Sequence, residues 1–324
     1  MTANVDRAGW RSSTSGPAAP PTWRRYLVSA LAALPRIDGH CGVDDLADGV
    51  AGLVGAVGAA WTHPAAPPVR LLPTVLAYQD LPLRDPRPEI PIGIAELDLG
   101  PVWLDLRTDP HFLVYGEAGC GKSAFLRAFA RSIVARTTPH DAKIVLIDYR
   151  RSLLGSVTGE HLLAYGTAAP RADEILTEVA QVMRGRLPGA DVTTQQPRDR
   201  SWWRGPQLYV LVDDYELVAA ASGNPMAHLL DCLGQARDIG LHVIIARRSG
   251  GAARAMYEPV TLNMRETGSA GLVLSTDRED GVLLGGVKPA SLPPGRGWLV
   301  TRRGGPQLIQ LALLDPAPEV TGSR

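Results

Sequence analysis

The stretch from Gly116 to Ser123 constrains this chain more tightly than any other part of its sequence. It reads Gly-Glu-Ala-Gly-Cys-Gly-Lys-Ser and fits the phosphate-binding pattern G-x-x-x-x-G-K-[ST] at every position. Glycines let the backbone curl so closely that successive N–H groups point at phosphate oxygens. Lys122 is the residue type that neutralises the β- and γ-phosphates, and the hydroxyl of Ser123 is suited to ligate Mg²⁺.

The flanking sequence supplies the context that this pattern requires. Residues 111–115 form a short apolar run that is typical of a buried parallel strand. Residues 123–134 carry apolar residues at helical spacing, with basic residues on the other face. A glycine loop between a strand and a helix N-terminus favours an anion site over a chance glycine turn. The residues predicted to contact the nucleotide are Gly116, Glu117, Ala118, Gly119, Cys120, Gly121, Lys122, Ser123 and Ala124.

A second run, residues 209–214, has the form of a strand that closes on two carboxylates. Such a strand ends beside the phosphate loop, where Asp213 would hold Mg²⁺ through water. Asp214 stands where enzymes with this phosphate-loop pattern usually carry a glutamate that orients the attacking water. The aspartate side chain is one methylene shorter than that of glutamate. Misplacement by about 1 Å can lower a rate on the order of a hundredfold. Glu216 would lie on the same face as Asp214 if the strand continued. The predicted catalytic residues are Lys122 and Asp214, and the predicted metal ligands are Ser123 and Asp213.

Other residues near these motifs allow two interpretations each. Arg247-Arg248 and Arg150-Arg151 follow predicted strands and could contact phosphate or a neighbouring subunit, or could form solvated basic turns. Trp202-Trp203 lies among arginines in a polar segment, which suits a partner surface, stacking on bases, or packing on its own domain. Cys120 occupies a position that the pattern leaves open, so it needs no redox role.

Strands that alternate with helices predict a parallel sheet covered by helices on both faces. The predicted strands are 102–106, 111–115, 143–148, 207–213, 241–246 and 271–274, and the predicted helices are 123–134, 172–187 and 225–239. A terminal β-hairpin is expected over 297–314, turned at Gly304-Gly305. The expected divisions are a disordered N-terminus (1–25), a helix-bearing segment (26–64), a proline-rich linker (65–88), the main domain (89–316) and a tail (317–324).

Composition narrows the choice of partners and compartment. The 33 Lys plus Arg residues balance 33 Asp plus Glu residues, which argues against a dedicated binder of duplex DNA. Three widely spaced cysteines give neither a disulfide framework nor a zinc site, so we expect a reducing, cytoplasmic environment. The weakly charged stretch 50–61 falls short of the roughly 20 residues that span a bilayer, and residues 1–25 lack the apolar core of a signal peptide.

Several runs beyond these motifs resemble the last ATPase module of EccC, the FtsK/SpoIIIE-type ATPase family of the actinobacterial type VII (ESX) secretion systems. They lie in order between residues 65 and 314, at 90–94, 110–116, 148–151, 212–216, 235–242, 246–251 and 293–297. Residues 26–61, which include Ala-Leu-Pro-Arg-Ile-Asp-Gly at 33–39, resemble the end of the preceding ATPase module and its connector.

The resemblance implies a RecA-like P-loop NTPase fold, ATP and Mg²⁺ as ligands, and contact with the C-terminal signal of small WXG100-type (Esx) substrates. It also implies assembly with other EccC ATPase modules, for example into a hexamer, with contact to the inner membrane through partner subunits and with weak or partner-dependent hydrolysis. Family members carry membrane-spanning helices and three ATPase modules. We therefore expect this chain to be a C-terminal piece, either a split gene product or a truncated copy. Two alternatives stay open: an FtsK-like double-stranded DNA translocase and a nucleotide-gated binding module without useful catalysis.

Overall fold

The chain divides into two compact units, residues 1–69 and residues 70–324. The computed structural model describes residues 46–62, 71–189, 196, 201–220, 223–252, 257–302 and 304–314. In the first unit these residues include helix α2 (Leu46–Ala60), where the sequence predicts a helix. The predicted disordered N-terminus (1–25), most of the segment 26–64 and the tail (317–324) lie outside the described residues.

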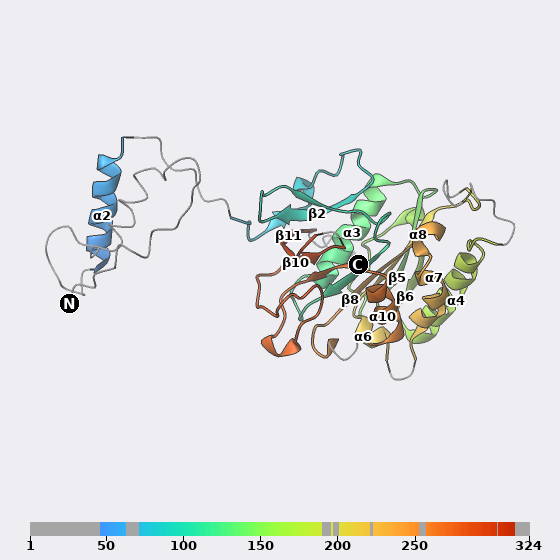
Figure 1. Cartoon of the computed structure of the whole chain (residues 1–324). Helices are drawn as coiled ribbons and strands as arrows, with labels where there is room; N and C mark the ends of the chain where they lie inside the picture. Colours follow the sequence, from blue (N-terminus) through green and yellow to red (C-terminus); the bar gives the residue numbers. More distant parts are fainter. Residues whose placement is uncertain are drawn as a thin grey trace, which may run out of the picture. The chain divides into compact units, whose positions relative to one another are not determined.

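One large sheet forms the centre of the second unit (Figure 1). Its strands run in the order β3-β2-β11-β10-β9-β4-β8-β7-β5-β6, and β1 pairs with β11. The strand bounds are β1 Leu76–Ala77, β2 Ile90–Ala95, β3 Pro101–Leu104, β4 His111–Tyr115, β5 Ala142–Ile147, β6 Leu162–Gly166, β7 Gln207–Val212, β8 Leu241–Arg247, β9 Ala270–Val273, β10 Arg296–Val300 and β11 Gln307–Leu313.

The sheet has a parallel half and an antiparallel half. Neighbouring strands from β9 through β4, β8, β7 and β5 to β6 pair in parallel. Strands β10 and β11 form the predicted C-terminal hairpin, and β2 and β3 extend the sheet in antiparallel register. The parallel strand order places β4 between β8 and β9, with β7 next to β8. The loops that follow β4 and β7 therefore emerge at one edge of the sheet.

Three strands escaped prediction for different reasons. Strand β1 is only two residues long and lies in the predicted linker (65–88). Strand β2 contains Pro91 and Gly93, residue types that weaken strand propensity. At Gly93 a side chain would collide with the backbone carbonyl of Gln310 on the adjacent β11, so glycine is required there. Strand β6 lies at the end of the sheet and is only partly buried, so it lacks the continuous apolar run of a central strand.

Helices cover both faces of the sheet, as predicted. The described helices of this unit are α3 (Lys122–Arg136), α4 (Ala169–Arg184), α6 (Tyr215–Val218), α7 (Leu230–Leu233), α8 (Ala236–Ile239) and α10 (Pro259–Glu266), with short 3-10 turns such as η4 (Pro225–Leu229) between them. Figure 1 shows α3 apart from the group formed by α4, α7 and α10. The helix predicted over 225–239 is instead divided into η4, α7 and α8, and the non-helical backbone of Gln235 separates α7 from α8.

Strand β4 contributes side chains to the hydrophobic cores on both faces of the sheet. Leu113 and Tyr115 pack in the core that includes α4, α7 and α10, whereas Phe112 and Val114 pack in the core beneath α3. This alternation follows from the two-residue period of a strand. Because every residue of β4 is buried, the loop that follows it starts from a rigid support.

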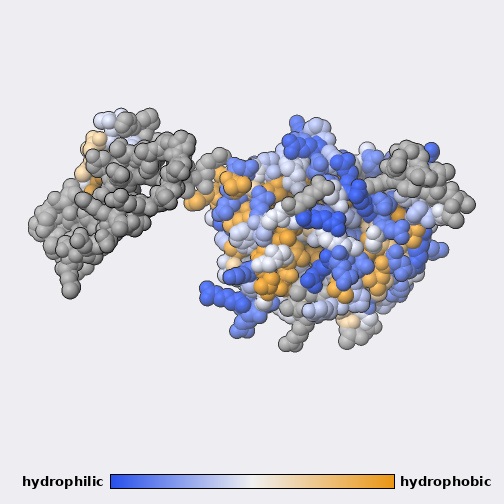
Figure 2. All heavy atoms as spheres, in the orientation of Figure 1, coloured by the Kyte–Doolittle hydropathy of each residue, from blue (hydrophilic) through white to orange (hydrophobic). Residues whose placement is uncertain are grey.

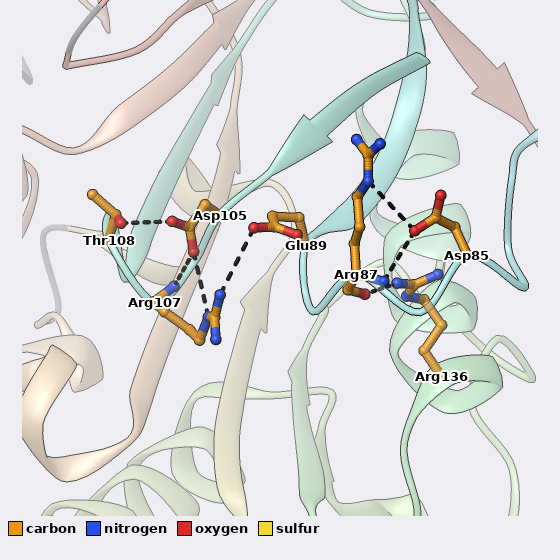
Figure 3. Close-up of polar contacts among 7 residues, drawn as sticks. All are labelled: Asp85, Arg87, Glu89, Asp105, Arg107, Thr108 and Arg136. Carbon is orange, nitrogen blue, oxygen red and sulfur yellow. Dashed lines mark hydrogen bonds and ion pairs between the residues drawn. The ribbon is translucent and has the colours of Figure 1, made fainter. Parts of the chain in front are cut away.

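Residues 71–88, part of the linker predicted over 65–88, belong to the second unit and contact its other elements at several points. Tyr78 OH accepts a hydrogen bond from Ser132 on α3 at 3.2 Å. Arg136, in the last turn of α3, donates to the carbonyls of Leu83 and Arg87. The guanidinium groups of Arg87 and Arg136 also lie over the ring of Trp103, at 5.1 and 5.7 Å. Figure 3 shows these two arginines beside the Asp85 turn, and Arg107 bridging Asp105 and Glu89 nearby.

The surface view in Figure 2 shows hydrophilic residues over much of the visible face of this unit, with hydrophobic residues in separate patches. Among the residues that the structure describes, no helix has the length and apolar character needed to cross a bilayer.

Buried His111, the first residue of β4, links stability to pH. Its Nδ1 accepts a hydrogen bond from the backbone N–H of Val243 at 3.2 Å, and its Nε2 lies 3.2 Å from the carbonyl oxygen of Leu233. A neutral ring with its proton on Nε2 satisfies both contacts. Burial lowers the pKa of His111 from 6.5 to about 4. Because the folded-state pKa lies below the unfolded one, the neutral buried ring contributes fully to the stability of the fold above about pH 6.5. This contribution is lost as the pH falls toward 4.

We expect His111 to contribute roughly 3 kcal/mol to the fall in unfolding free energy between pH 7 and pH 4. His111→Gln should lower stability at pH 7 and flatten the pH dependence. Urea denaturation at several pH values measures both effects, with the exposed His140→Gln as the matched control. Parallel pH profiles for the wild type and His111→Gln would contradict the assignment.

Candidate nucleotide-binding site

The loop between β4 and α3 has the tight turn that its glycines predict. Gly119 and Gly121 adopt positive φ angles of 74° and 112°, which L-residues with side chains rarely reach. At Gly116 the limit is space, because an added Cβ would lie 2.5 Å from Cys120 Sγ and 2.9 Å from Leu274 Cβ. Helix α3 begins at Lys122, so its first free N–H groups belong to this loop.

Lys122 closes the loop with its side chain. Its Nζ donates to the carbonyl oxygens of Gly116 at 2.9 Å and Glu117 at 2.8 Å. The residue is buried, so its ammonium charge interacts more strongly with neighbouring charges than it would in bulk water.

Three neighbouring segments hold the loop from outside. Cys120 O accepts from the N–H of Gly295 at 2.9 Å, Gly116 N donates to Arg247 O at 3.3 Å, and Glu117 N donates to Ser275 O at 2.8 Å. The Glu117 carboxylate also accepts from Ser249 Oγ at 2.6 Å. Burial raises the pKa of the Cys120 thiol, which agrees with a packing role for this side chain.

Asp213 lies at the carboxyl end of β7 and is fully buried. Its Oδ1 accepts from the N–H of Asp214 at 3.0 Å, and its Oδ2 has no hydrogen-bond partner. Burial raises its pKa to about 6, the nearby Ser123 hydroxyl lowers it, and the Asp214 and Asp148 carboxylates raise it.

The donor set fits a divalent cation. A buried carboxylate oxygen without a partner is costly unless a proton or a cation satisfies it, and Ser123 supplies a hydroxyl beside it. Mg²⁺ prefers such oxygen ligands together with water and phosphate oxygens. Ser123 and Asp213 are therefore the residues that could hold the ion.

Asp214 follows β7 in a left-handed conformation, with φ 44° and ψ 54°. Its Oδ2 forms an ion pair with Arg150 Nε at 2.9 Å. The strand ends at Val212 and α6 begins at Tyr215, so the condition for Glu216 to share a strand face with Asp214 is not met. Glu216 instead accepts a hydrogen bond from the backbone N–H of Arg248 at 3.1 Å.

A cavity of about 210 Å³ lies at the mouth of the loop. Its lining consists of Ala118, Gly119, Lys122, Ser123, Arg150, Ser152, Asp214 and Arg248. Three cationic side chains and one carboxylate thus face one space, which suits a polyphosphate. Both arginine pairs that the sequence left open contribute one member to the cavity, Arg150 and Arg248. Arg247 is buried instead, with its Nε 3.4 Å from the Arg248 carbonyl oxygen.

Asp148 is a residue whose role the sequence analysis missed. It follows β5 and is buried; its Oδ1 accepts from Arg150 N at 3.1 Å, and its Oδ2 accepts from Leu153 N at 2.7 Å and from Tyr165 OH at 2.9 Å. The side chain therefore fixes the turn that carries Arg150. An aspartate directly after a buried strand was the available signal, because such carboxylates often cap the next turn.

The tryptophan pair packs on its own domain. Trp202 Nε1 donates to Arg186 O and Trp203 Nε1 donates to Asp238 O, both at 2.7 Å. The Arg186 guanidinium lies 4.3 Å from the centre of the Trp203 ring. Both indole N–H groups are thus satisfied internally, which favours the packing interpretation over an exposed stacking platform.

A central parallel strand, a glycine loop closed by lysine and a neighbouring strand that ends in a buried carboxylate define a RecA-like P-loop ATPase fold, as predicted. The solved cytoplasmic domain of the type VII secretion ATPase EccC from Thermomonospora curvata superposes with a TM-score of 0.79 at 48% identity, covering 87% of this chain and 33% of that one. A structure of ATPases 2 and 3 of that EccC in complex with a signal sequence peptide gives the same TM-score and identity, covering 51% of that chain.

Residues 78–248 match the FtsK/SpoIIIE family, and the chain belongs to this family. It is 50% identical over 283 residues to the ESX secretion system protein EccC of Thermomonospora curvata, covering 87% of this chain. It is 43% identical over 256 residues to the ESX-4 secretion system protein EccC4 of Mycobacterium tuberculosis, covering 78% of this chain. The resemblance to EccC is thereby confirmed. The chain spans 21% of the length of both relatives, about a fifth.

Asp213 provides a stability prediction for the site. The folded-state pKa of Asp213 is raised, so its protonated form contributes to the stability of the fold. This contribution is complete below the unfolded pKa of about 4 and is lost as the pH rises through about 6. Without nucleotide at pH 8, we expect Asp213→Asn to raise the unfolding free energy by roughly 1–3 kcal/mol, with the difference closing near pH 4. Denaturant unfolding at both pH values measures it, and the exposed Asp231→Asn is the control. A destabilised Asp213→Asn protein at pH 8 would contradict this account.

Proposed function

We propose that this chain is the ATP-binding module of a type VII secretion ATPase that couples nucleotide binding to recognition of WXG100-type substrates. The observation that carries the proposal is the convergence of Lys122, Ser123 and Asp214 on one cavity, with the unpartnered Asp213 oxygen beside it. The family supports the type of motor, because 50% identity to an EccC protein extends over most of the chain.

Each side chain has a defined task in this proposal. Lys122 exchanges its hydrogen bonds to the two loop carbonyls for hydrogen bonds to phosphate oxygens. The N–H groups of the loop and of the first turn of α3 donate to the remaining phosphate oxygens. Ser123 and Asp213 hold Mg²⁺, which supplies charge neutralisation for the β- and γ-phosphates. Asp214 orients the attacking water. Because this carboxylate is short and already paired with Arg150, we expect slow intrinsic hydrolysis that depends on partners.

The substrate part of the proposal comes from the relatives. The Thermomonospora curvata EccC structure with a signal sequence peptide contains ATPases 2 and 3, and this chain covers half of it at 48% identity. That structure supports a substrate with a signal sequence. From the resemblance to EccC we further assign this chain small WXG100-type substrates with a C-terminal signal, and assembly with other EccC ATPase modules. A double-stranded DNA translocase is disfavoured by the balanced charge of the chain.

Steady-state hydrolysis of MgATP with and without a WXG100-type protein tests this function. We expect low basal turnover that rises when the substrate carries its C-terminal signal and that does not rise with the same substrate truncated before the signal. Asp214→Asn should lower the stimulated rate at least about tenfold while ATP still binds. Stimulation by duplex DNA in place of the substrate would contradict the proposal. Tight binding of ATP and substrate without any turnover would instead identify a nucleotide-gated binding module.

A further inference from the structure

The cavity holds two arginines that are each paired with a carboxylate. Arg150 Nε lies 2.9 Å from Asp214 Oδ2, whereas Arg248 Nη2 lies 3.7 Å from Glu117 Oε2. Only the first pair involves the carboxylate that would orient water. In this arrangement the carboxylate that would orient water accepts from a cation that lines the same cavity.

Asp214 itself has little freedom to leave this pair. Its left-handed backbone is held by its N–H to Asp213 Oδ1 and by its carbonyl, which accepts from Leu217 N at 2.8 Å. Its side chain is 15% exposed. A short side chain on a fixed backbone cannot follow a moving partner.

Arg150 has the opposite properties. Its backbone N–H is fixed by Asp148, and the next turn is tied to α3 because Arg127 donates to Ser152 O at 2.9 Å. Its side chain is long and 58% exposed, and it lines the cavity together with Lys122. Rotation about its side-chain bonds can therefore move the guanidinium away from Asp214 within the cavity without moving the backbone.

We propose that Arg150 is a positioning residue that senses the γ-phosphate. It pairs with Asp214 when the cavity lacks a γ-phosphate, and it turns to that group when MgATP binds, which releases the Asp214 carboxylate to orient water. A guanidinium binds phosphate oxygens in a bidentate manner, and a triphosphate carries more charge than one carboxylate. MgADP lacks the terminal group and leaves the pair intact. This inference rests on the proposed ATP-binding function.

The test compares equilibrium affinities for MgATP and MgADP, measured by titration calorimetry without turnover. Arg150→Ala should weaken MgATP binding about tenfold and MgADP binding less than about twofold. Asp214→Asn should tighten MgATP binding several-fold, because Arg150 no longer has to leave an ion pair. In the Arg150→Ala/Asp214→Asn double variant, this gain should vanish, and the non-additivity is the signature of the exchange.

Arg171→Ala is the matched control, because Arg171 forms an exposed 2.9 Å ion pair with Glu174 and does not line this cavity. It should leave both affinities unchanged. Equal losses for MgATP and MgADP in Arg150→Ala, or additive effects in the double variant, would overturn the role of Arg150 while leaving the proposed function intact. A wild-type chain that does not bind MgATP would overturn the proposed function and this inference together.

Discussion

The contacts between the Lys122 ammonium and the carbonyls of Gly116 and Glu117 are the interaction on which the site depends. They hold the glycine loop closed in a form from which Lys122 can exchange those carbonyls for phosphate oxygens, while the loop N–H groups donate to the same phosphates. A long cation reaches back into its own loop only because Gly116 has no side chain and Gly119 and Gly121 take positive φ angles. The sheet supports this turn from below, because β4 is buried along its whole length.

Residues at the start of β10 connect the phosphate loop by hydrogen bonds to the beginning of the second unit and to its last strand, β11. Gly295, which donates to Cys120 O in the phosphate loop, also accepts from Leu311 N on β11 at 2.7 Å. Arg296 beside it donates to the carbonyls of Leu72 and Pro73. The C-terminal hairpin, the phosphate loop and the start of the unit are therefore joined by consecutive short hydrogen bonds. Contacts of Arg136 with residues 83 and 87 fasten the same segment to the far end of α3.

Local patterns predicted the central strands, helices α3 and α4 and the hairpin, and they located the glycine loop after β4 and the two carboxylates after β7. These elements carry strong signals, because buried parallel strands are continuously apolar and the phosphate loop tolerates few residue types. The pairing of Arg150 with Asp214 could not be predicted, since it depends on how the turn after β5 is fixed by Asp148 and Tyr165. The register that places Gln310 against Gly93 is equally non-local.

The same distinction applies to the ends of elements. The run that ends β7 looked extendable from sequence, yet the chain turns at Asp214 because its left-handed backbone starts α6. Such a turn needs support from hydrogen bonds to Asp213 and Leu217, which a strand pattern does not encode. Tertiary contacts therefore determine the geometry of the Asp214 carboxylate, and only the position of Asp214 along the chain was predictable.

The most direct test of the central claim is the affinity of MgATP for the wild-type chain and for Lys122→Ala, measured by calorimetry at equal protein stability. We expect saturable binding with one site per chain and a loss of at least about a hundredfold in Lys122→Ala, because the variant removes the buried cation of the loop. Equal affinity for the two proteins would contradict the account, since nucleotide would then bind elsewhere than at the phosphate loop.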